Sequence, residues 1–281
     1  MTKIQWTNEV WNPVTGCTWE STGCDHCYAR VMGTRLSGIK NNPRYGHPFS
    51  DVMCHEDRLV QPYNWKRPRM VFVNSMSDLF HDDVPGDFII DVLVTIRKSP
   101  QHTYQILTKR PKRMLRMFSE WFGKKGSLGP VLENLWVGIT CENQEQADAR
   151  IPVLLETPAA VRWVSVEPQL EFVNLENYLV KQKSEFLPGI DWVVCGGESG
   201  QSARHFNIEW ARTLRSQCGS YGVSFFMKQI GSNPWSQCYD NESDIGYPER
   251  IETVHSKGGD PLEWPDDLRV REFPGGNHEL F

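Results

Sequence analysis

Three of the eight cysteines fall within eleven residues near the start of the chain, at Cys17, Cys24 and Cys27. The other five are scattered along the rest of the sequence. Nothing at the N-terminus reads as a secretory signal, and intracellular thiols are kept reduced, so a disulfide framework is not expected. Clustered cysteines in such a chain more often bind metal or take part in catalysis. The spacing therefore predicts a metal or cluster site on this segment.

The spacing alone leaves two kinds of site open. In a cubane iron–sulfur cluster each iron needs an outer ligand, and three thiolates leave one iron free for a small molecule. A structural zinc ion needs a closed set of ligands, so a further donor is required. His26 would force the chain to fold back sharply, whereas the more distant Cys54 or His55 could complete a zinc site. Three thiols without any metal are the remaining alternative.

Polar residues follow each of a series of apolar runs, and these runs are the elements that must position the chemistry. The runs are rich in β-branched residues and are separated by helix-like stretches, which indicates parallel βαβ units. The strands that this pattern predicts are 70–73, 104–107, 135–139, 161–166, 190–195 and 223–227. Because the carboxyl ends of parallel strands carry the chemistry, a barrel gathers these polar ends around one mouth. We therefore predict an α/β fold, a partial (β/α) barrel of about six parallel strands.

The predicted organisation is a barrel over residues 1–230, with the cysteine loop at 16–28 and a helix starting near Cys27. Residues 231–281 are rich in Pro, Gly, Asp and Glu and are expected to form an irregular extension that wraps the barrel. The net charge of −5 does not favour global attraction to nucleic acid or to membranes. The longest apolar stretch, 88–94, is too short to span a bilayer, so a soluble, cytoplasmic protein is expected.

The cysteine motif resembles the radical SAM signature, with a longer first gap and with His26 in place of the usual aromatic residue. Other motifs occur in order along nearly the whole chain, and as a set they resemble the phage-associated Gp37/Gp68-like family, a radical-SAM-like family of unknown function. The motifs that carry this resemblance are Trp11–Cys17, Cys27–Ala29, Met76–His81, Leu107–Pro111, Val166–Pro168, Gly196–Gly200, Lys228–Gln229 and Gly258–Pro261. The resemblance implies a barrel of radical SAM type with a [4Fe–4S] cluster on Cys17, Cys24 and Cys27. It also implies S-adenosylmethionine as cofactor and an electron donor such as flavodoxin or ferredoxin.

The activity so implied is reductive cleavage of S-adenosylmethionine to a 5′-deoxyadenosyl radical that acts on an unidentified substrate. The phage context of the similar proteins and the basic run at 109–113 favour a nucleic acid or nucleotide. The rival hypothesis is a zinc-stabilised, non-catalytic nucleic-acid-binding module. A degenerate barrel that holds the cluster without cleaving the cofactor is a further alternative.

Position in the barrel, rather than a motif, predicts the cofactor-binding residues. Polar groups at the first strand ends are expected to bind S-adenosylmethionine: its amino group at Asn74, Ser75 and Ser77, its carboxylate at Lys109 or Arg110, and its ribose at Thr140 and Glu142.

Later strand ends supply the predicted catalytic residues Glu167, Glu198 and Cys141. Glu198 could instead stabilise a tight turn at a helix N-terminus. Cys141 could donate hydrogen to a radical or could be a small buried hydrophobe. Asp78 faces the pocket or caps a turn, and Lys228 binds an anionic group or is solvated.

Overall fold

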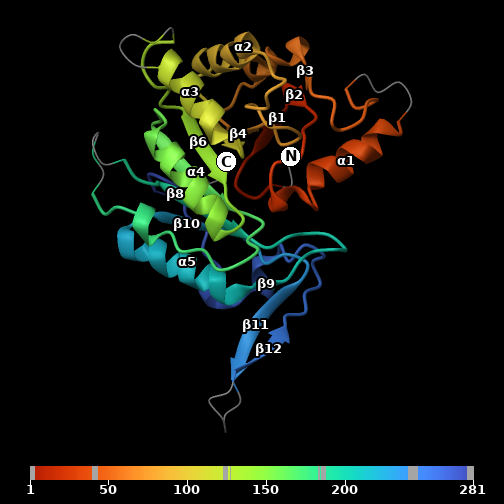
Figure 1. Cartoon of the computed structure of the whole chain (residues 1–281), viewed down its shortest axis with the longest axis vertical. Helices are drawn as coiled ribbons and strands as arrows, with labels where there is room; N and C mark the ends of the chain where they lie inside the picture. The colour runs from red at the N-terminus through yellow and green to blue at the C-terminus, as the bar shows by residue number, and fades with distance from the viewer. Residues whose placement is uncertain are drawn as a thin grey trace. The chain divides into compact units, whose positions relative to one another are not determined.

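Helices and parallel strands alternate along the chain, which confirms the α/β class (Figure 1). The structure, a computed structural model, describes residues 4–39, 44–122, 126, 128–182, 184, 188–239 and 246–276. The chain forms two compact units. Among the described residues, the first contains those up to Ile139 together with Pro152–Arg162, and the second contains Thr140–Ile151 and those that follow Arg162.

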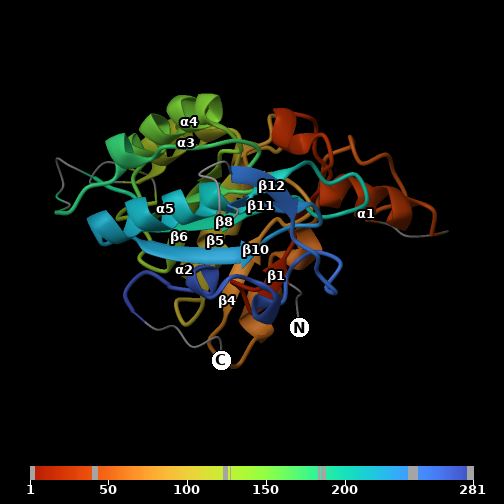
Figure 2. The ribbon, with the colours of Figure 1, turned by 90° about the horizontal axis from the view of Figure 1, so that it is seen from below.

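The first unit is built on parallel strands in the order β1-β4-β5-β6, and two of its helices follow β4 and β5 (Figure 2). The strands are β1 (Glu9–Trp11), β4 (Met70–Val73), β5 (Thr103–Thr108) and β6 (Leu135–Thr140), and the helices are α2 (Gly86–Arg97) and α3 (Pro111–Trp121). Every residue of β4 and β6 is buried, as expected for strands covered on both faces. α3 begins at Pro111, whose fixed φ and missing N–H suit a first helical position.

The second unit contains parallel strands in the order β7-β8-β10 and a separate three-stranded sheet in the order β12-β11-β9. These strands are β7 (Val161–Val166), β8 (Trp192–Gly196), β9 (Phe206–Asn207), β10 (Ser224–Gln229), β11 (Pro234–Tyr239) and β12 (Gly246–Arg250). The helices are α4 (Gln144–Glu156), which begins in this unit, and α5 (Ile208–Tyr221). α5 starts where the Asn207 side chain accepts from the Glu209 N–H at 3.0 Å and stops at Gly222, whose φ is 70°.

All six strands expected from the apolar runs are present, but the strand count was wrong. The structure has seven parallel strands among the described residues, because β1 also pairs with β4. β1 has three residues, too few to produce a recognisable period in the sequence. The segment after Gly231, expected to be irregular, contains β11 and β12; residues 240–245 and 277–281 of it lie outside the described part.

The same segment also packs onto the strands before it. The Met227 N–H donates to Val270 at 2.8 Å, and the Trp192 indole N–H donates to Glu272 at 2.8 Å. Short 3₁₀ turns complete the fold: η1 (Thr22–Cys24), η2 (Glu56–Arg58), η3 (Gln61–Asn64), η4 (Glu176–Tyr178), η5 (Pro261–Glu263) and η6 (Asp266–Leu268). In the described ranges, no helix has the length and apolar character needed to cross a membrane.

Candidate functional site

The cysteine loop belongs to the first unit and follows β2 (Val14–Thr15), which forms a small antiparallel pair with β3 (Met53–Cys54). Gly16 donates its N–H to the Met76 carbonyl at 3.1 Å, and Cys17 donates to the Phe49 carbonyl at 2.8 Å. Gly16 has φ of 87°, and a Cβ there would collide with the Asp51 carbonyl oxygen. A glycine is therefore required immediately before the first cysteine.

The other two cysteines bracket the start of a helix. Cys24 ends η1, and Cys27 directly precedes α1 (Tyr28–Ser37). The Cys27 N–H donates to the Cys24 carbonyl at 3.3 Å, so both lie on one tight turn. All three thiols are free and partly exposed. The pKa of Cys17 is raised to about 11. Burial is the largest cause, and Asp78 and the nearby Cys24 also raise this pKa, whereas Arg110 lowers it.

The three thiols of the loop are suitable ligands for an iron–sulfur cluster, although the side chains are not positioned as a metal-binding group. Within the described ranges, no three His, Cys, Asp or Glu side chains are arranged to hold a metal ion. The loop carries three free thiols, and the buried Ser21 hydroxyl between Cys17 and Cys24 has no hydrogen-bond partner there. A buried hydroxyl without a partner is costly, so an additional acceptor next to it would be favourable. His55, a candidate zinc ligand, is 2.8 Å from the Thr15 hydroxyl.

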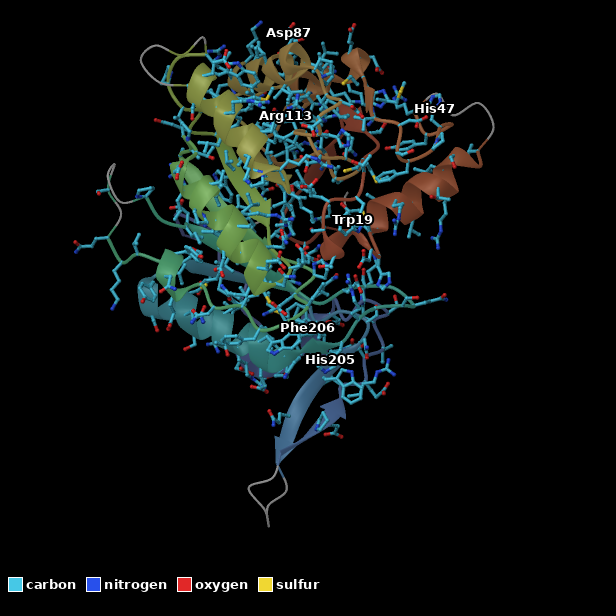
Figure 3. The ribbon with its side chains drawn as sticks, viewed as in Figure 1. Trp19, His47, Asp87, Arg113, His205 and Phe206 are labelled. Carbon is cyan, nitrogen blue, oxygen red and sulfur yellow. The ribbon has the colours of Figure 1, made fainter. Side chains whose placement is uncertain are left out.

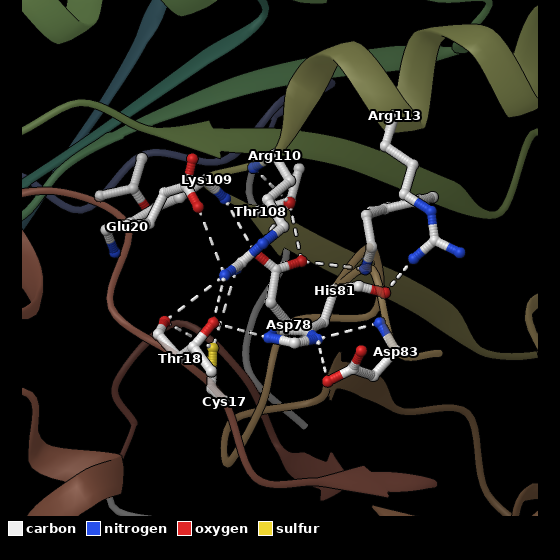
Figure 4. A network of polar contacts seen from close by, with 12 residues as sticks. Cys17, Thr18, Glu20, Asp78, His81, Asp83, Thr108, Lys109, Arg110 and Arg113 are labelled. Atoms are coloured by element: carbon white, nitrogen blue, oxygen red, sulfur yellow. Dashed lines mark hydrogen bonds and ion pairs between the residues drawn. The ribbon is translucent and has the colours of Figure 1, made fainter. Parts of the chain in front are cut away.

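Arg110 fastens this loop to the carboxyl end of β5 (Figure 4). Its guanidinium donates to the Thr18 hydroxyl at 3.1 Å and lies 3.8 Å from the Cys17 sulfur. It also pairs with Asp78 at 3.2 Å and with Glu20 at 3.3 Å. The side chains of Arg110 and Asp78 are 9% and 8% exposed, so this pair is buried. Desolvation is the largest single effect on the pKa of Arg110 and lowers it. The negative groups Asp78, Cys17 and Glu20 together outweigh desolvation, so the pKa of Arg110 is raised above its ordinary value.

Asp78, expected to face the pocket or to cap a turn, does cap a turn and is also the buried counter-charge of Arg110. Its carboxylate accepts from the Thr108 hydroxyl at 2.7 and 2.9 Å, from the Lys109 N–H at 3.0 Å and from the Phe80 N–H at 2.9 Å. Carboxylates surrounded by several donors are strongly anchored. The sequence had no signal for this pairing, because Asp78 and Arg110 lie 32 positions apart.

The turn after β4, predicted to bind the cofactor amino group, is largely occupied by contacts to the strand before the cysteines. The Ser75 hydroxyl donates to Asn12 at 3.2 Å and the Ser77 hydroxyl donates to Val14 at 2.9 Å. Asn74 is buried, has φ of 63°, and accepts from the Val14 N–H at 3.2 Å. Its amide nitrogen has no partner among the described residues. A strained residue with an unused buried donor is typical of a functional position.

Of the two predicted carboxylate-binding cations, one is engaged and one is available. Arg110 is held by the contacts above. Lys109 is partly exposed, and its ammonium group makes no hydrogen bond or ion pair in the part of the chain that the structure describes. Lys109 is therefore the cation at the end of β5 that can bind an anionic group.

The predicted ribose-binding residues of the second unit are closed off by an arginine. Glu142 is fully buried and pairs with Arg150 at 3.2 Å. Arg150 also donates to the Thr140 carbonyl at 2.7 Å, and the Thr140 residue is 2% exposed. Contact with a ribose would require this buried arrangement to open.

The Glu198 carboxylate is likewise paired with an arginine. Its carboxylate accepts from the Arg204 side chain at 2.6 and 3.1 Å and from the Arg204 N–H at 2.9 Å. A Cβ on Gly197 would lie 2.5 Å from the Ile230 carbonyl oxygen, so the Gly-Gly-Glu turn is shaped by close backbone packing. The structure therefore gives Glu198 a direct part in stabilising this turn.

Glu167 pairs with Lys228 and is the most exposed of the three strand-end carboxylates Glu142, Glu167 and Glu198. Glu167 follows β7 and Lys228 lies near the end of β10, with their charged atoms 2.5 Å apart and their side chains 14% and 16% exposed. Cys141 is fully buried, and its N–H donates to Ser165 at 3.0 Å. Cys195 is also buried, and burial raises its pKa well above the ordinary value.

The family model described as "Protein of unknown function (DUF5131)" matches residues 1–258. The chain belongs to this family. No curated protein matches the chain. No solved structure matches it either. The family is thus shown, whereas its phage association and its radical SAM chemistry stay predictions.

For this DUF5131 protein the chemistry must therefore be inferred from geometry. The first unit offers a cysteine loop with an adjacent guanidinium, an unused amide donor and a free ammonium group. These groups suit an anionic, thiolate-bound centre and an anionic ligand. The second unit offers Glu167 and Lys228, which can hold or transfer a proton at a strand end.

Proposed function

We propose that this protein is an iron–sulfur enzyme of radical SAM type, with a partial (β/α) barrel fold. One observation carries the proposal: three free, partly exposed thiols lie on one loop that buried contacts fix at the carboxyl ends of β1, β4 and β5. Parallel α/β folds carry their chemistry at these strand ends.

Cys17, Cys24 and Cys27 would hold a [4Fe–4S] cluster, and Arg110 would offset the negative charge of the thiolates next to Cys17. The Ser21 hydroxyl supplies a donor that has no other use in the described structure. Such a cluster supplies one electron for the cleavage of S-adenosylmethionine to a 5′-deoxyadenosyl radical, which abstracts hydrogen from a substrate. The protein's part is to bind and orient the reactants.

Asn74 and Lys109 are the best candidates to bind the cofactor carboxylate. The free atom of Asn74 is a donor, since its oxygen already accepts from Val14. It therefore suits a carboxylate rather than the cofactor's amino group, which is itself a donor. Lys109 adds a free positive charge in the same unit. Ser75 and Ser77 retain hydroxyl lone pairs that can accept from the amino group.

Glu167 and Lys228 are proposed to act on the substrate. The two side chains form an ion pair and are partly exposed, which leaves them accessible. A nucleic acid or nucleotide remains the favoured substrate class, because the partly exposed Lys109 and the exposed Lys112 can contact phosphates.

The test is anaerobic purification and reconstitution with iron and sulfide. We expect a brown protein that absorbs at about 400 nm, as is typical of cubane clusters. After reduction by dithionite it should form 5′-deoxyadenosine from S-adenosylmethionine. Cys24→Ala should abolish both signals. Cys54→Ala, which removes another partly exposed thiol, should retain both.

Two results would contradict the proposal. A colourless protein that holds one tightly bound zinc ion, lost in Cys24→Ala, would indicate the zinc-stabilised binding module. A brown protein that never forms 5′-deoxyadenosine would indicate a barrel that has lost the reaction.

A further inference from the structure

The exposed apolar side chains are concentrated around the cysteine loop. Ten large apolar residues are exposed in the described part of the chain, and five of them fall between residues 19 and 39. We call these five the α1 patch: Trp19, Tyr28, Val31, Met32 and Ile39, which are 59%, 53%, 48%, 45% and 53% exposed. Trp19 lies inside the loop and is labelled in Figure 3. A cluster of this kind usually marks an interaction surface.

Helix α1 presents its larger apolar residues outward rather than inward. Its buried residues are the small Ala29 and Gly33, and a Cβ on Gly33 would lie 2.5 Å from the Phe49 ring. Tyr28, Val31 and Met32 follow one helical face, spaced three and four residues apart. In both ribbon views α1 lies away from β4, β5 and β6 of its own unit (Figures 1 and 2). An ordinary surface helix has the opposite arrangement.

The composition of the patch fits a protein partner. Trp, Tyr, Met and Arg are enriched in protein interfaces, whereas the aliphatic Val31, Met32 and Ile39 offer neither stacking nor charge to a nucleic acid. Helix α1 itself carries two exposed arginines, Arg30 and Arg35, and no acidic residue, so its exposed face is basic. Arg35 has no ion-pair partner among the described residues. The complementary partner is therefore acidic.

A second copy of the chain fits this surface poorly. A two-fold interface brings the same patch of each copy together, so the arginines of one copy would face those of the other. Like charges placed opposite one another are unfavourable.

We propose that the α1 patch docks an acidic one-electron donor protein that carries a reduced flavin or an iron–sulfur centre. This inference rests on the proposed function, in which the loop of Cys17, Cys24 and Cys27 needs an electron. Trp19 lies between the first two of these cysteines and Tyr28 directly follows the third, so a donor on the patch is beside the site. One electron passes from the donor, which is oxidised, to the centre on this loop, which is reduced. No covalent bond forms or breaks in this step.

The experiment measures binding of an acidic flavodoxin to the full chain by calorimetry at low ionic strength. Met32→Glu and Arg35→Glu should each weaken binding about tenfold or more, the loss typical of a central interface residue. The controls make the same changes elsewhere: Val254→Glu at a residue that is 96% exposed, and Arg116→Glu on the exposed face of α3. Both should bind within about twofold of the wild type, and added salt should weaken wild-type binding.

Absent wild-type binding, or equal binding by patch and control variants, overturns the docking proposal. So does a wild-type dimer that Met32→Glu dissociates, or displacement of flavodoxin by single-stranded DNA. Cleavage of S-adenosylmethionine driven by dithionite keeps the two proposals apart. If dithionite drives cleavage but flavodoxin does not use the patch, docking fails alone. If flavodoxin binds through the patch but no cluster forms, the proposed function fails and the docking surface stands.

Discussion

Replacement of Asp78 by Asn tests whether a buried ion pair holds the cysteine loop in place. The change keeps the size of the side chain and removes its charge. Arg110 would then lie at 9% exposure without its buried counter-charge, and one of the donors around Asp78 would lose its acceptor. Arg110, which contacts Thr18 and Glu20 of the cysteine loop, would lose the carboxylate that holds its guanidinium in place.

The magnitude follows from this burial. Removal of one partner from a buried ion pair typically costs about 3–5 kcal/mol. Arg110 keeps its second partner, Glu20, at 3.3 Å, which places the expected loss of unfolding free energy at the lower end, about 3 kcal/mol. For a chain of this size the midpoint of thermal unfolding should fall by roughly 6 °C. Thermal and urea unfolding followed by tryptophan fluorescence measures both quantities.

Glu20→Gln is the matched control, because it removes a carboxylate from the same guanidinium at the surface. The Glu20 side chain is 37% exposed, and exposed pairs contribute less than about 1 kcal/mol. Arg110→Met should cost less in the Asp78→Asn background than in the wild type, since the pair acts as a unit. Equal losses for Asp78→Asn and Glu20→Gln would refute the reasoning.

The remaining predictions test local features. Asn74→Gly should be more stable than Asn74→Ala by about 1 kcal/mol in urea unfolding, because φ is 63° and both lose the same side-chain bond. Gly197→Ala should destabilise the protein by about 1–3 kcal/mol, since its Cβ would meet the Ile230 carbonyl. Gly219→Ala, where the Cβ enters open space in α5, should instead stabilise by about 0.5–1 kcal/mol. Burial lowers the pKa of His102, so the unfolded chain binds its proton at higher pH than the folded protein. The unfolding free energy should therefore fall as pH drops from about 7 to 5, by up to about 1.4 kcal/mol per unit for this group, and His102→Phe should make the dependence shallower.

The sequence could predict the strands because a buried parallel strand is apolar along its whole length. The runs 70–73 and 161–166 match β4 and β7 residue for residue. β1 was not predicted because it has only three residues and is positioned by pairing with β4, which is a long-range contact. Cys17, Cys24 and Cys27 stood out by their spacing alone. The fold around them could not be predicted, since the Asp78–Arg110 pair joins two loops that only the parallel order brings together.

The same limit applies to the strand-end carboxylates of the second unit. A sequence identifies a carboxylate after a strand, but its availability depends on the cation that the fold places beside it. Arg150 buries Glu142 completely, and Arg204 makes two side-chain contacts to Glu198. Such pairs are compensated internally, and opening one would leave a buried charge without its partner.

Glu167 differs because its partner comes from another strand, 61 positions away, and both side chains remain partly exposed. A lysine offers one compact charge rather than a two-pronged clamp, so another anion can compete for it. Of the three carboxylates, Glu167 can therefore exchange its partner for a substrate at the lowest cost in stability. Under the proposed function, Glu167 and Lys228 are therefore the second unit's pair expected to contact the substrate.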